Sequence, residues 1–447
     1  MSNAVVSAFK NKQLRKKLLF TTLILIVVRF GSQLPIPEID SAQISAYLKS
    51  TLGDSFSLLN SFTGGSFMQM SVFALSVTPY ITSSIIMQLM TIVIPALEEM
   101  QKDGEDGRKR MAKITRYVTV VLAIIEGAGL AIGFANQGAL GTDYTTFTIV
   151  TMIIALTAGA VLVMWLGERI TESGIGNGIS IILLINIVAR IPNDLSNLYQ
   201  NYVAKPTDVT SKIIAAVIIL AIIVAMFVFI VFLQDGERRI PVQYAKKIQG
   251  HKVSGGQSSH IPLKVNTAGV IPVIFASSMM SLPVVIASFA GIQPKTGPDA
   301  TFFQKFLTLC NQSDWCKIGS FAEFKYTLGL LIYIGLVIFF AYFYTSVTFN
   351  PLEISNNMKK QGGFIPGIRP GKPTTEYLTT VLNSIIFLGA IGMVIVCALP
   401  IFFSGAFGAD VSFSGTSLII VVGVVIETIK QIESLVLVRH YKGFLGN

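Results

Sequence analysis

The sequence predicts an all-α polytopic membrane protein, and three observations support this fold class. Of the 447 residues, 52% are hydrophobic and only 13% are charged. Continuous apolar runs of about 20 residues recur along the chain, and this is the length that a helix needs to cross the hydrocarbon of a bilayer. The runs do not alternate between polar and apolar residues, so they predict helices rather than the strands of a barrel.

The chain contains ten such runs, and each predicts one transmembrane helix. They lie near residues 18–34, 73–95, 115–135, 148–167, 177–192, 213–233, 268–290, 326–347, 378–402 and 414–435. The basic N-terminus and the first run together are similar to a signal peptide. However, Arg29, Gln33 and Pro35 stand where a small-residue cleavage site would follow. We therefore expect the first run to be retained as a span.

The basic residues predict the orientation of the chain. Most of the 34 lysines and arginines fall on one side of the spans, which includes the N-terminus and the loops 234–264 and 348–376. Because basic segments stay in the cytoplasm, both termini are expected there. The net charge of +10 fits this bias, and it also suits an acidic partner such as ribosomal RNA or anionic lipid. On the opposite side, Cys310 and Cys316 could pair if that space is oxidising.

Ten spans divide into two halves of five, residues 1–192 and 213–447, with a polar external hinge at 193–212. With an odd number of spans in each half, the second half starts from the opposite membrane face. This permits a pseudo-symmetric inverted repeat with a functional site between the halves. Residues 56–70 are semi-apolar, contain Gly64-Gly65 and are too short to span. They form either a re-entrant segment or an ordinary external loop.

The chain carries no enzyme motif that we recognise. It has neither a His-Glu-x-x-His zinc helix nor a Gly-x-Ser-x-Gly nucleophile elbow. Gly371-Lys372 is similar to part of a phosphate-binding loop, but Pro366 and Pro373 stand where that loop needs Gly and then Ser or Thr. We expect no catalytic residue, no metal and no cofactor. Energy for transport must then come from a partner or a gradient.

Four ionisable residues fall inside the predicted spans: Arg29, Glu126, Glu427 and Lys430. A charge at the bilayer centre costs about 2.5–3.5 kcal/mol on insertion scales, so each is expected to face protein or water. Arg29 could snorkel to the outer interface, and Glu427 could pair with Lys430 three residues later. Only Glu126 suits the midplane site of a small-molecule transporter. A proton- or ion-coupled transporter would usually show more of a relay than this, and an intramembrane enzyme would need a nucleophile or metal motif.

Short motifs stand in a specific order along nearly the whole chain. They are Phe62-Thr63-Gly64-Gly65, Phe73-Ala74-Leu75 with Pro79-Tyr80-Ile81, Met164-Trp165-Leu166-Gly167-Glu168, Gly174 to Ser180, Arg238-Arg239 with Tyr244-Ala245-Lys246, Pro262 to Asn266, Gly269 to Pro272, Asn350-Pro351, Pro366 to Gly371 and Gly415-Thr416-Ser417. In this order the motifs resemble the SecY family, the central subunits of protein-conducting channels in the cell membrane.

The resemblance implies an hourglass of two five-helix halves. Unfolded polypeptides with a signal sequence would cross between the halves, and apolar segments would leave sideways into lipid. SecE and SecG would be small membrane partners, and the ATPase SecA or the ribosome would drive transport. A ring of apolar side chains would seal the pore at Val77, Ile81, Ile179, Leu183, Ile274 and Ile420. Val77 and Leu183 depart from the family's isoleucine but remain apolar.

The resemblance also assigns the parts that open and close. Residues 56–70 match the plug, a short helix that contains Phe62, Gly64 and Gly65 and closes the external funnel. A lateral gate would lie between spans two and three and spans seven and eight. Its polar cluster, joined by mutual hydrogen bonds, would be Gln88, Glu126 and Asn266, and a signal sequence would pack near Ile86, Leu282 and Ile286. Glu126 departs from the uncharged residue of other members.

The cytoplasmic loops match the docking surface for SecA or the ribosome. Its basic residues would be Arg238, Arg239, Lys246, Lys247 and Arg369. Guanidinium and ammonium groups suit the phosphates of ribosomal RNA. The resemblance gives Arg369, which lies between the turns of Pro366 to Gly371, the role of coupling the channel to its motor.

Overall fold

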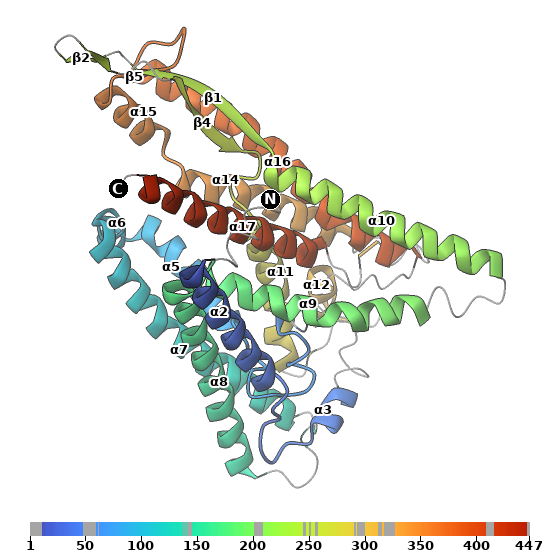
Figure 1. Cartoon of the computed structure of the whole chain (residues 1–447). Helices are drawn as coiled ribbons and strands as arrows, with labels where there is room; N and C mark the ends of the chain where they lie inside the picture. The colour runs from blue at the N-terminus through green and yellow to red at the C-terminus, as the bar shows by residue number, and fades with distance from the viewer. Residues whose placement is uncertain are drawn as a thin grey trace.

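A computed structural model describes residues 11–47, 60, 62–136, 138, 140, 145–200, 209–244, 247–249, 252–254, 258–289, 292, 300–311, 315–316, 327–407 and 415–444. These residues contain ten long helices, shown in Figure 1. They are α2 (Lys12–Gly31), α5 (Thr78–Val93), α7 (Gly104–Asn136), α8 (Thr146–Ser173), α9 (Gly178–Leu198), α10 (Val209–Asp235), α11 (Ile271–Phe289), α14 (Leu328–Thr348), α16 (Lys372–Phe407) and α17 (Gly415–Phe444). Each overlaps one of the predicted spans, which confirms the helical fold class.

Proline sets both ends of α5, and the prediction was wrong about where this helix begins. The span was expected from residue 73, but α5 starts at Thr78 with Pro79 in its first turn. Proline lacks an N–H and suits that position. At the other end, Ile94 precedes Pro95 and is extended, as the proline ring requires of its predecessor. The chain then turns by 108° into a short helix that was not predicted, α6 (Pro95–Lys102).

The long helices differ in how well they could span a membrane alone. By length and composition, four of the helices in the described part of the chain are long and apolar enough, or five if the bent pair α5 and α6 is one span. Shorter apolar stretches occur at Gly178–Asn193, Leu220–Asp235 and Ile271–Val284. Two of these belong to α9 and α11. Both helices pack on neighbours at the seams described next, so they need less lipid-facing surface.

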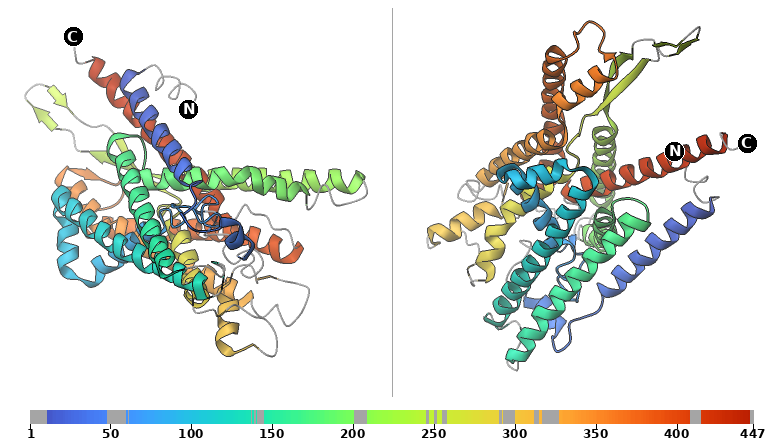
Figure 2. Two further views of the ribbon diagram at one scale, coloured as in Figure 1. Left: turned by 90° about the horizontal axis from the view of Figure 1, so that it is seen from below. Right: turned by 90° about the vertical axis from the view of Figure 1, so that its left-hand side faces the viewer.

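The helices form two groups that meet along two seams. In the first group α5, α7, α8 and α9 pack in sequence order and α2 packs on α8 and α9, while in the second α10, α11, α14, α16 and α17 pack on one another. The groups touch where α7 packs on α11 and where α9 packs on α17. Figures 1 and 2 show both groups from three directions. These contacts fit two five-helix halves, and the inverted symmetry stays a prediction. Of the predicted hinge at 193–212, residues 193–198 continue α9 and residues 209–212 begin α10, and residues 201–208 lie outside the described residues.

The two basic loops fold together into a small sheet, which an all-α expectation does not include. Strand β1 (Glu237–Tyr244) pairs antiparallel with β4 (Ser258–Lys264) and, on its other edge, with β5 (Gly363–Phe364). Beyond them, β2 (Lys247–Gln249) pairs with β3 (Lys252–Ser254). Ile240 and Val242 are buried against Leu378 of α16 and Met358 of the short helix α15 (Pro351–Lys360). The sheet stands at the top of Figure 1 and ties loop 234–264 to loop 348–376.

Two further short helices lie in the connections on the opposite side from this sheet. They are α3 (Ser41–Tyr47), which follows α2, and α12 (Phe302–Cys310), which lies between α11 and α14. Ile44 of α3 and Leu307 of α12 are fully buried. Both helices therefore belong to the packed structure, although at seven and nine residues neither is long enough to be predicted as a span.

Candidate functional site

The apolar residues expected to seal a pore lie together at the seam between the two helix groups. Val77, Leu183 and Ile420 are at most 5% exposed, and Ile179 and Ile274 are nearly as buried. Ile81 is partly buried and packs against the same cluster. These side chains come from α5, α9, α11 and α17, so both helix groups contribute. The structure thus gathers all six predicted residues into one apolar block that excludes water.

The glycine-rich start of α9 places Ile179 in this block. A Cβ on Gly178 would overlap the carbonyl oxygen of Gly167 in α8. Only glycine at position 178 therefore allows the start of α9 to lie this close to α8. Asn177 caps the helix, since its Oδ1 accepts the N–H groups of Ile179 at 3.2 Å and Ser180 at 3.4 Å. The glycines of Gly174 to Ser180 thus allow a sharp turn and a close approach of the α8 and α9 backbones.

Of the predicted plug segment, Asn60 and Phe62 are helical and residues 63–70 form turns. Gly64 and Gly65 have φ of +66° and +91°, a left-handed conformation that a right-handed helix does not continue through. Residues 56–59 and 61 lie outside the described residues, so the full extent of the expected short helix stays a prediction. Phe62 packs against the buried cluster that contains the apolar block.

A buried amide holds this segment in place, and the sequence interpretation missed it. Asn186 of α9 is 1% exposed. Its Nδ2 donates to the carbonyl of Phe62 and to Ser76 Oγ, both at 3.1 Å, and its Oδ1 accepts from Arg29 Nη1 at 3.5 Å. Arg29 Nη1 also donates to the carbonyl of Gly64 at 3.4 Å. We call Arg29, Ser76 and Asn186 the polar clasp.

The polar clasp gives Arg29 a different position from the one expected. Snorkelling to the interface was one expectation, but the guanidinium instead turns to protein atoms inside the fold. Asn186 could have been noticed as a polar residue within the apolar run of α9, since polar groups inside spans are commonly functional. Its partners could not, because they lie 110 and 157 residues away in sequence.

The predicted polar gate residues lie on α5 (Gln88), on α7 (Glu126) and just before α11 (Asn266), and their polar groups do not bond to one another. Gln88 Nε2 donates to Ser84 Oγ on its own helix at 3.4 Å, and Asn266 Nδ2 donates to the carbonyl of Gly269 at 2.9 Å. Among the described residues, no hydrogen bond joins Gln88, Glu126 and Asn266. The expected mutual bonds were wrong because each amide has a nearer partner within its own segment.

The apolar gate residues are accessible, as a surface for a signal sequence requires. Leu282 and Ile286 of α11 are 50% and 58% exposed. Ile86 of α5 is half-buried. The two α11 residues are four apart and therefore share one face of the helix. An apolar helix could pack on this face without displacing the core of either group.

Comparisons with known proteins decide the family. The sequence matches the SecY family over residues 71–429. It is 42% identical to the protein translocase subunit SecY of Streptomyces scabiei, with all of both chains covered. The chain belongs to the SecY family. This membership bears out the expectation of a membrane channel subunit rather than an enzyme.

Solved structures show the same fold at lower identity. One solved structure is that of a SecY protein whose plug domain is described as stabilising the closed state of the translocation channel and maintaining a membrane seal. It is 18% identical, with a TM-score of 0.61 over 93% of this chain and 91% of that one. Another is the channel of the canine ribosome-channel complex from the endoplasmic reticulum, 18% identical, with a TM-score of 0.62 and the same coverage. The SecY-family channel fold is therefore shown for this chain.

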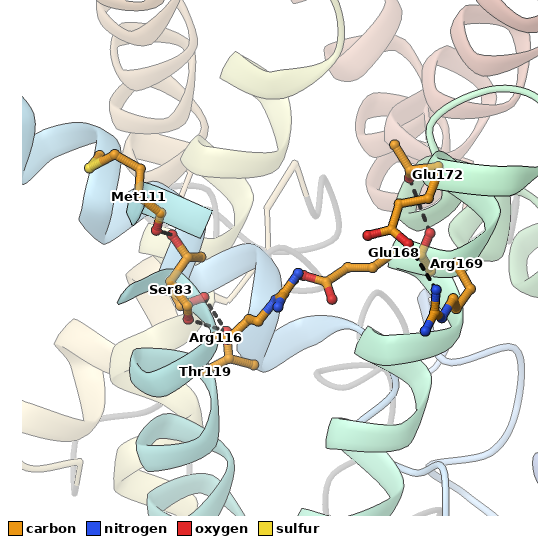
Figure 3. Close-up of polar contacts among 10 residues, drawn as sticks. Ser83, Met111, Arg116, Thr119, Glu168, Arg169 and Glu172 are labelled. Carbon is orange, nitrogen blue, oxygen red and sulfur yellow. Dashed lines mark hydrogen bonds and ion pairs between the residues drawn. The ribbon is translucent and has the colours of Figure 1, made fainter. Parts of the chain in front are cut away.

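Polar contacts bind three helices of the first group to one another (Figure 3). Ser83 Oγ of α5 and Thr119 Oγ1 of α7 are 2.6 Å apart and buried, and Arg116 Nε of α7 donates to Glu168 Oε1 of α8 at 2.7 Å. One side of the α7–α11 seam is thus a bonded unit of α5, α7 and α8. In a SecY-family fold, separation at this seam would move these helices together.

The in-span pair expected near the end of the chain was wrong. Lys430 Nζ lies 2.6 Å from Asp235 Oδ1 at the end of α10, so it does not depend on Glu427 for a partner. The pair joins α10 to α17 within the second group.

The predicted docking residues cluster on the small sheet and its edge. Arg238 and Arg239 are exposed on β1, although Arg239 Nε donates to Glu237 Oε1 at 2.7 Å. Lys247 begins β2. Lys246 lies outside the described residues. Arg369 is exposed, and its carbonyl accepts from Thr374 Oγ1 at 2.8 Å, which fixes the turn that presents it.

Cys310 and Cys316 are both buried free thiols. Burial raises the pKa of each, so the thiolate form that attacks disulfides or electrophiles is disfavoured. The pairing that the sequence left open is absent from the structure between these two described residues. Their burial beside Trp315 instead makes them part of the core of the second helix group.

Proposed function

We propose that this chain forms a channel through which unfolded, signal-bearing polypeptides cross the cytoplasmic membrane. The observation that carries the proposal is the apolar block of Val77, Ile81, Ile179, Leu183, Ile274 and Ile420, built from both helix groups. A constriction of this kind stops ions because water leaves it. It yields to a passing chain because apolar contacts are non-directional and can be replaced by those of the passenger.

Residues 62–70 act as the plug. Phe62 supports this role because it packs on the apolar block, and the polar clasp fastens the segment to α2 and α9. A solved relative of the same fold is described as having a plug domain that stabilises the closed state. Transport then requires the clasp to open and the segment to leave the block.

Apolar segments leave sideways at the seam of α7 and α11. The exposed stripe of Leu282 and Ile286, with Ile86 across the seam, offers a surface for a signal helix. Local hydrogen bonds of Gln88 and Asn266 support a gate that is held by packing. Such a gate can part without breaking a hydrogen bond between Gln88, Glu126 and Asn266.

Energy comes from partners at the cytoplasmic face, where both termini also lie. The exposed cations Arg238 and Arg369 and the sheet that joins their loops suit SecA or the ribosome. Channels of the same fold occur in ribosome complexes. SecE and SecG would bind the lipid-facing surface as small membrane subunits.

A reconstitution tests the proposal. The full chain is placed in vesicles with SecE and SecG, and SecA, ATP and a signal-bearing precursor are added outside. We expect protease-protected precursor that depends on ATP. The same precursor without its signal sequence is the control and should stay digestible. Absence of protected precursor while SecA hydrolyses ATP would refute the channel.

A further inference from the structure

We propose that α12 is an interfacial anchor whose aromatic face lies in the headgroup region of the outer lipid leaflet, beside the end of the gate helix α11. The proposal rests on the proposed function in one respect, since that function places the connection between α11 and α14 outside the cytoplasm. The partner is the lipid surface itself, rather than a protein.

The first turns of α12 are exposed and its last turn is buried. Leu307 and Cys310 are 0% and 6% exposed and join the core of the second helix group. In the first turns Phe302 is 86% exposed, Phe303 46% and Phe306 44%. Phe302 is therefore largely uncovered by protein and the other two rings are about half covered; together these three rings are called the aromatic face of α12. An apolar patch of this kind marks a contact with a partner or a membrane.

The helix is fixed and cannot turn to bury these rings. Trp315 is fully buried, and its Nε1 donates to the carbonyl of Leu309 at 2.9 Å. A Cβ on Gly329 of α14 would lie 2.0 Å from that same carbonyl oxygen, so the end of α12 sits directly on α14. At its start, the N–H of Thr301 donates to Gln304 Oε1 at 3.0 Å.

Lipid is the occupant that the surroundings favour. α12 packs on both α11 and α14, and these neighbours present apolar residues outward. Ile286 of α11 and Leu328 and Leu331 of α14 are 58%, 53% and 62% exposed. The aromatic face of α12 therefore continues a lipid-facing surface. Lys305 lies on its flank, and aromatic rings with a nearby cation are typical of helices that lie in the interface.

The anchor has a consequence for the gate. α11 is packed on α12 at one end and on α7 along the seam. The apolar face of an interfacial helix is buried about 5–10 Å into the boundary between headgroups and acyl chains. If α12 is held at this depth, it also fixes the position of the adjoining end of α11 along the membrane normal. Opening at the α7–α11 seam would then be a swing about a fixed outer end rather than a translation across the membrane.

Spin-label accessibility tests the anchor. Phe302→Cys and Phe306→Cys are made one at a time in the full chain with SecE and SecG, labelled with a nitroxide and reconstituted in vesicles. The unsubstituted chain measures labelling of the buried native thiols. We expect collision with oxygen to exceed collision with a water-soluble nickel chelate several-fold, as at Leu331→Cys, which is the lipid-facing control. Gln361→Cys, in an exposed cytoplasmic turn, should show the reverse preference.

Two outcomes overturn the anchor. Labels at Phe302 and Phe306 that behave like the label at Gln361 would place α12 in water. Labels shielded from both reagents would mean that protein covers the helix, such as a second copy or a partner subunit. Precursor protection is measured in the same vesicles. Protected precursor with a water-exposed α12 defeats only the anchor, whereas a lipid-exposed α12 without protection defeats only the proposed channel.

Discussion

Replacement of Asn186 by leucine should open the resting channel more often. Asn186 is buried and donates to the Phe62 carbonyl and to Ser76 Oγ, both at 3.1 Å. Leucine has the same branched shape, is larger and has no polar atom, so it removes these bonds and still fills the site. The plug segment keeps its apolar contact through Phe62 but loses its fastening to α9. The closed state is weakened while the helical fold should survive.

The structure sets the size of the effect. Of the two bonds at 3.1 Å, only the one to the Phe62 carbonyl holds the plug segment, and a buried carbonyl left without its donor costs about 1–3 kcal/mol in the closed state. The contact with Arg29 at 3.5 Å is longer and is not counted. A change of about 1–3 kcal/mol shifts an equilibrium about 5–150-fold. The ratio of open to closed channels should rise by a factor in that range.

Single-channel recording in a planar bilayer measures this ratio without SecA or precursor. Asn383→Leu is the matched control, because Asn383 is exposed on α16 and faces neither the plug nor the block. Ser76→Ala should give a smaller rise, and its combination with Asn186→Leu should add less than the sum of the two, because the residues share a bond. An open probability of Asn186→Leu within twofold of the unsubstituted channel, in protein that stays folded, would refute the clasp.

Three further changes test other parts of the proposal. Ile81→Gly with Ile274→Gly should raise resting ion conductance, because it opens space in the apolar block; unchanged conductance would argue against the seal. Arg369→Glu should strongly reduce SecA-driven precursor protection, whereas Lys359→Glu, a nearby exposed charge reversal, should leave most of it; equal loss would point to general charge effects. Alkylation of Cys310 by a maleimide should need a higher pH than alkylation of a free thiol, because burial raises its pKa and lowers the thiolate fraction at any given pH; matching pH profiles would contradict its burial.

Hydrophobic patterning predicted the helices well because a span must be long and apolar whatever its neighbours are. All ten predicted runs correspond to helices. Helix ends were less predictable, since they depend on local backbone geometry. The turn before Thr78, where Ser76 has φ of +49°, and the break at Pro95 set the limits of α5. The small sheet was missed because its strands are short and belong to two loops that are distant in sequence.

For the site, apolar and polar residues differed in predictability. The six residues of the block followed from family motifs, and burial at a common seam needs only that each be apolar and face inward. Polar partners depend on atoms within about 3 Å of one another, and sequence spacing does not give such distances. Lys430 therefore bonded to Asp235 instead of Glu427, and Gln88 and Asn266 bonded within their own segments.

The same contrast indicates how the channel can be tight at rest and still open. The apolar block loses little when a polypeptide enters, because the side chains of the passenger replace its contacts without a required geometry. The clasp has no such replacement, since the Phe62 carbonyl must lie 3.1 Å from Asn186 Nδ2 for the bond to exist. Departure of the plug therefore breaks the clasp outright but only exchanges partners in the block. It follows that changes in the block should alter how much current an open or leaking channel passes. Changes in the clasp should alter how often it opens, and single-channel amplitude and open probability measure the two separately.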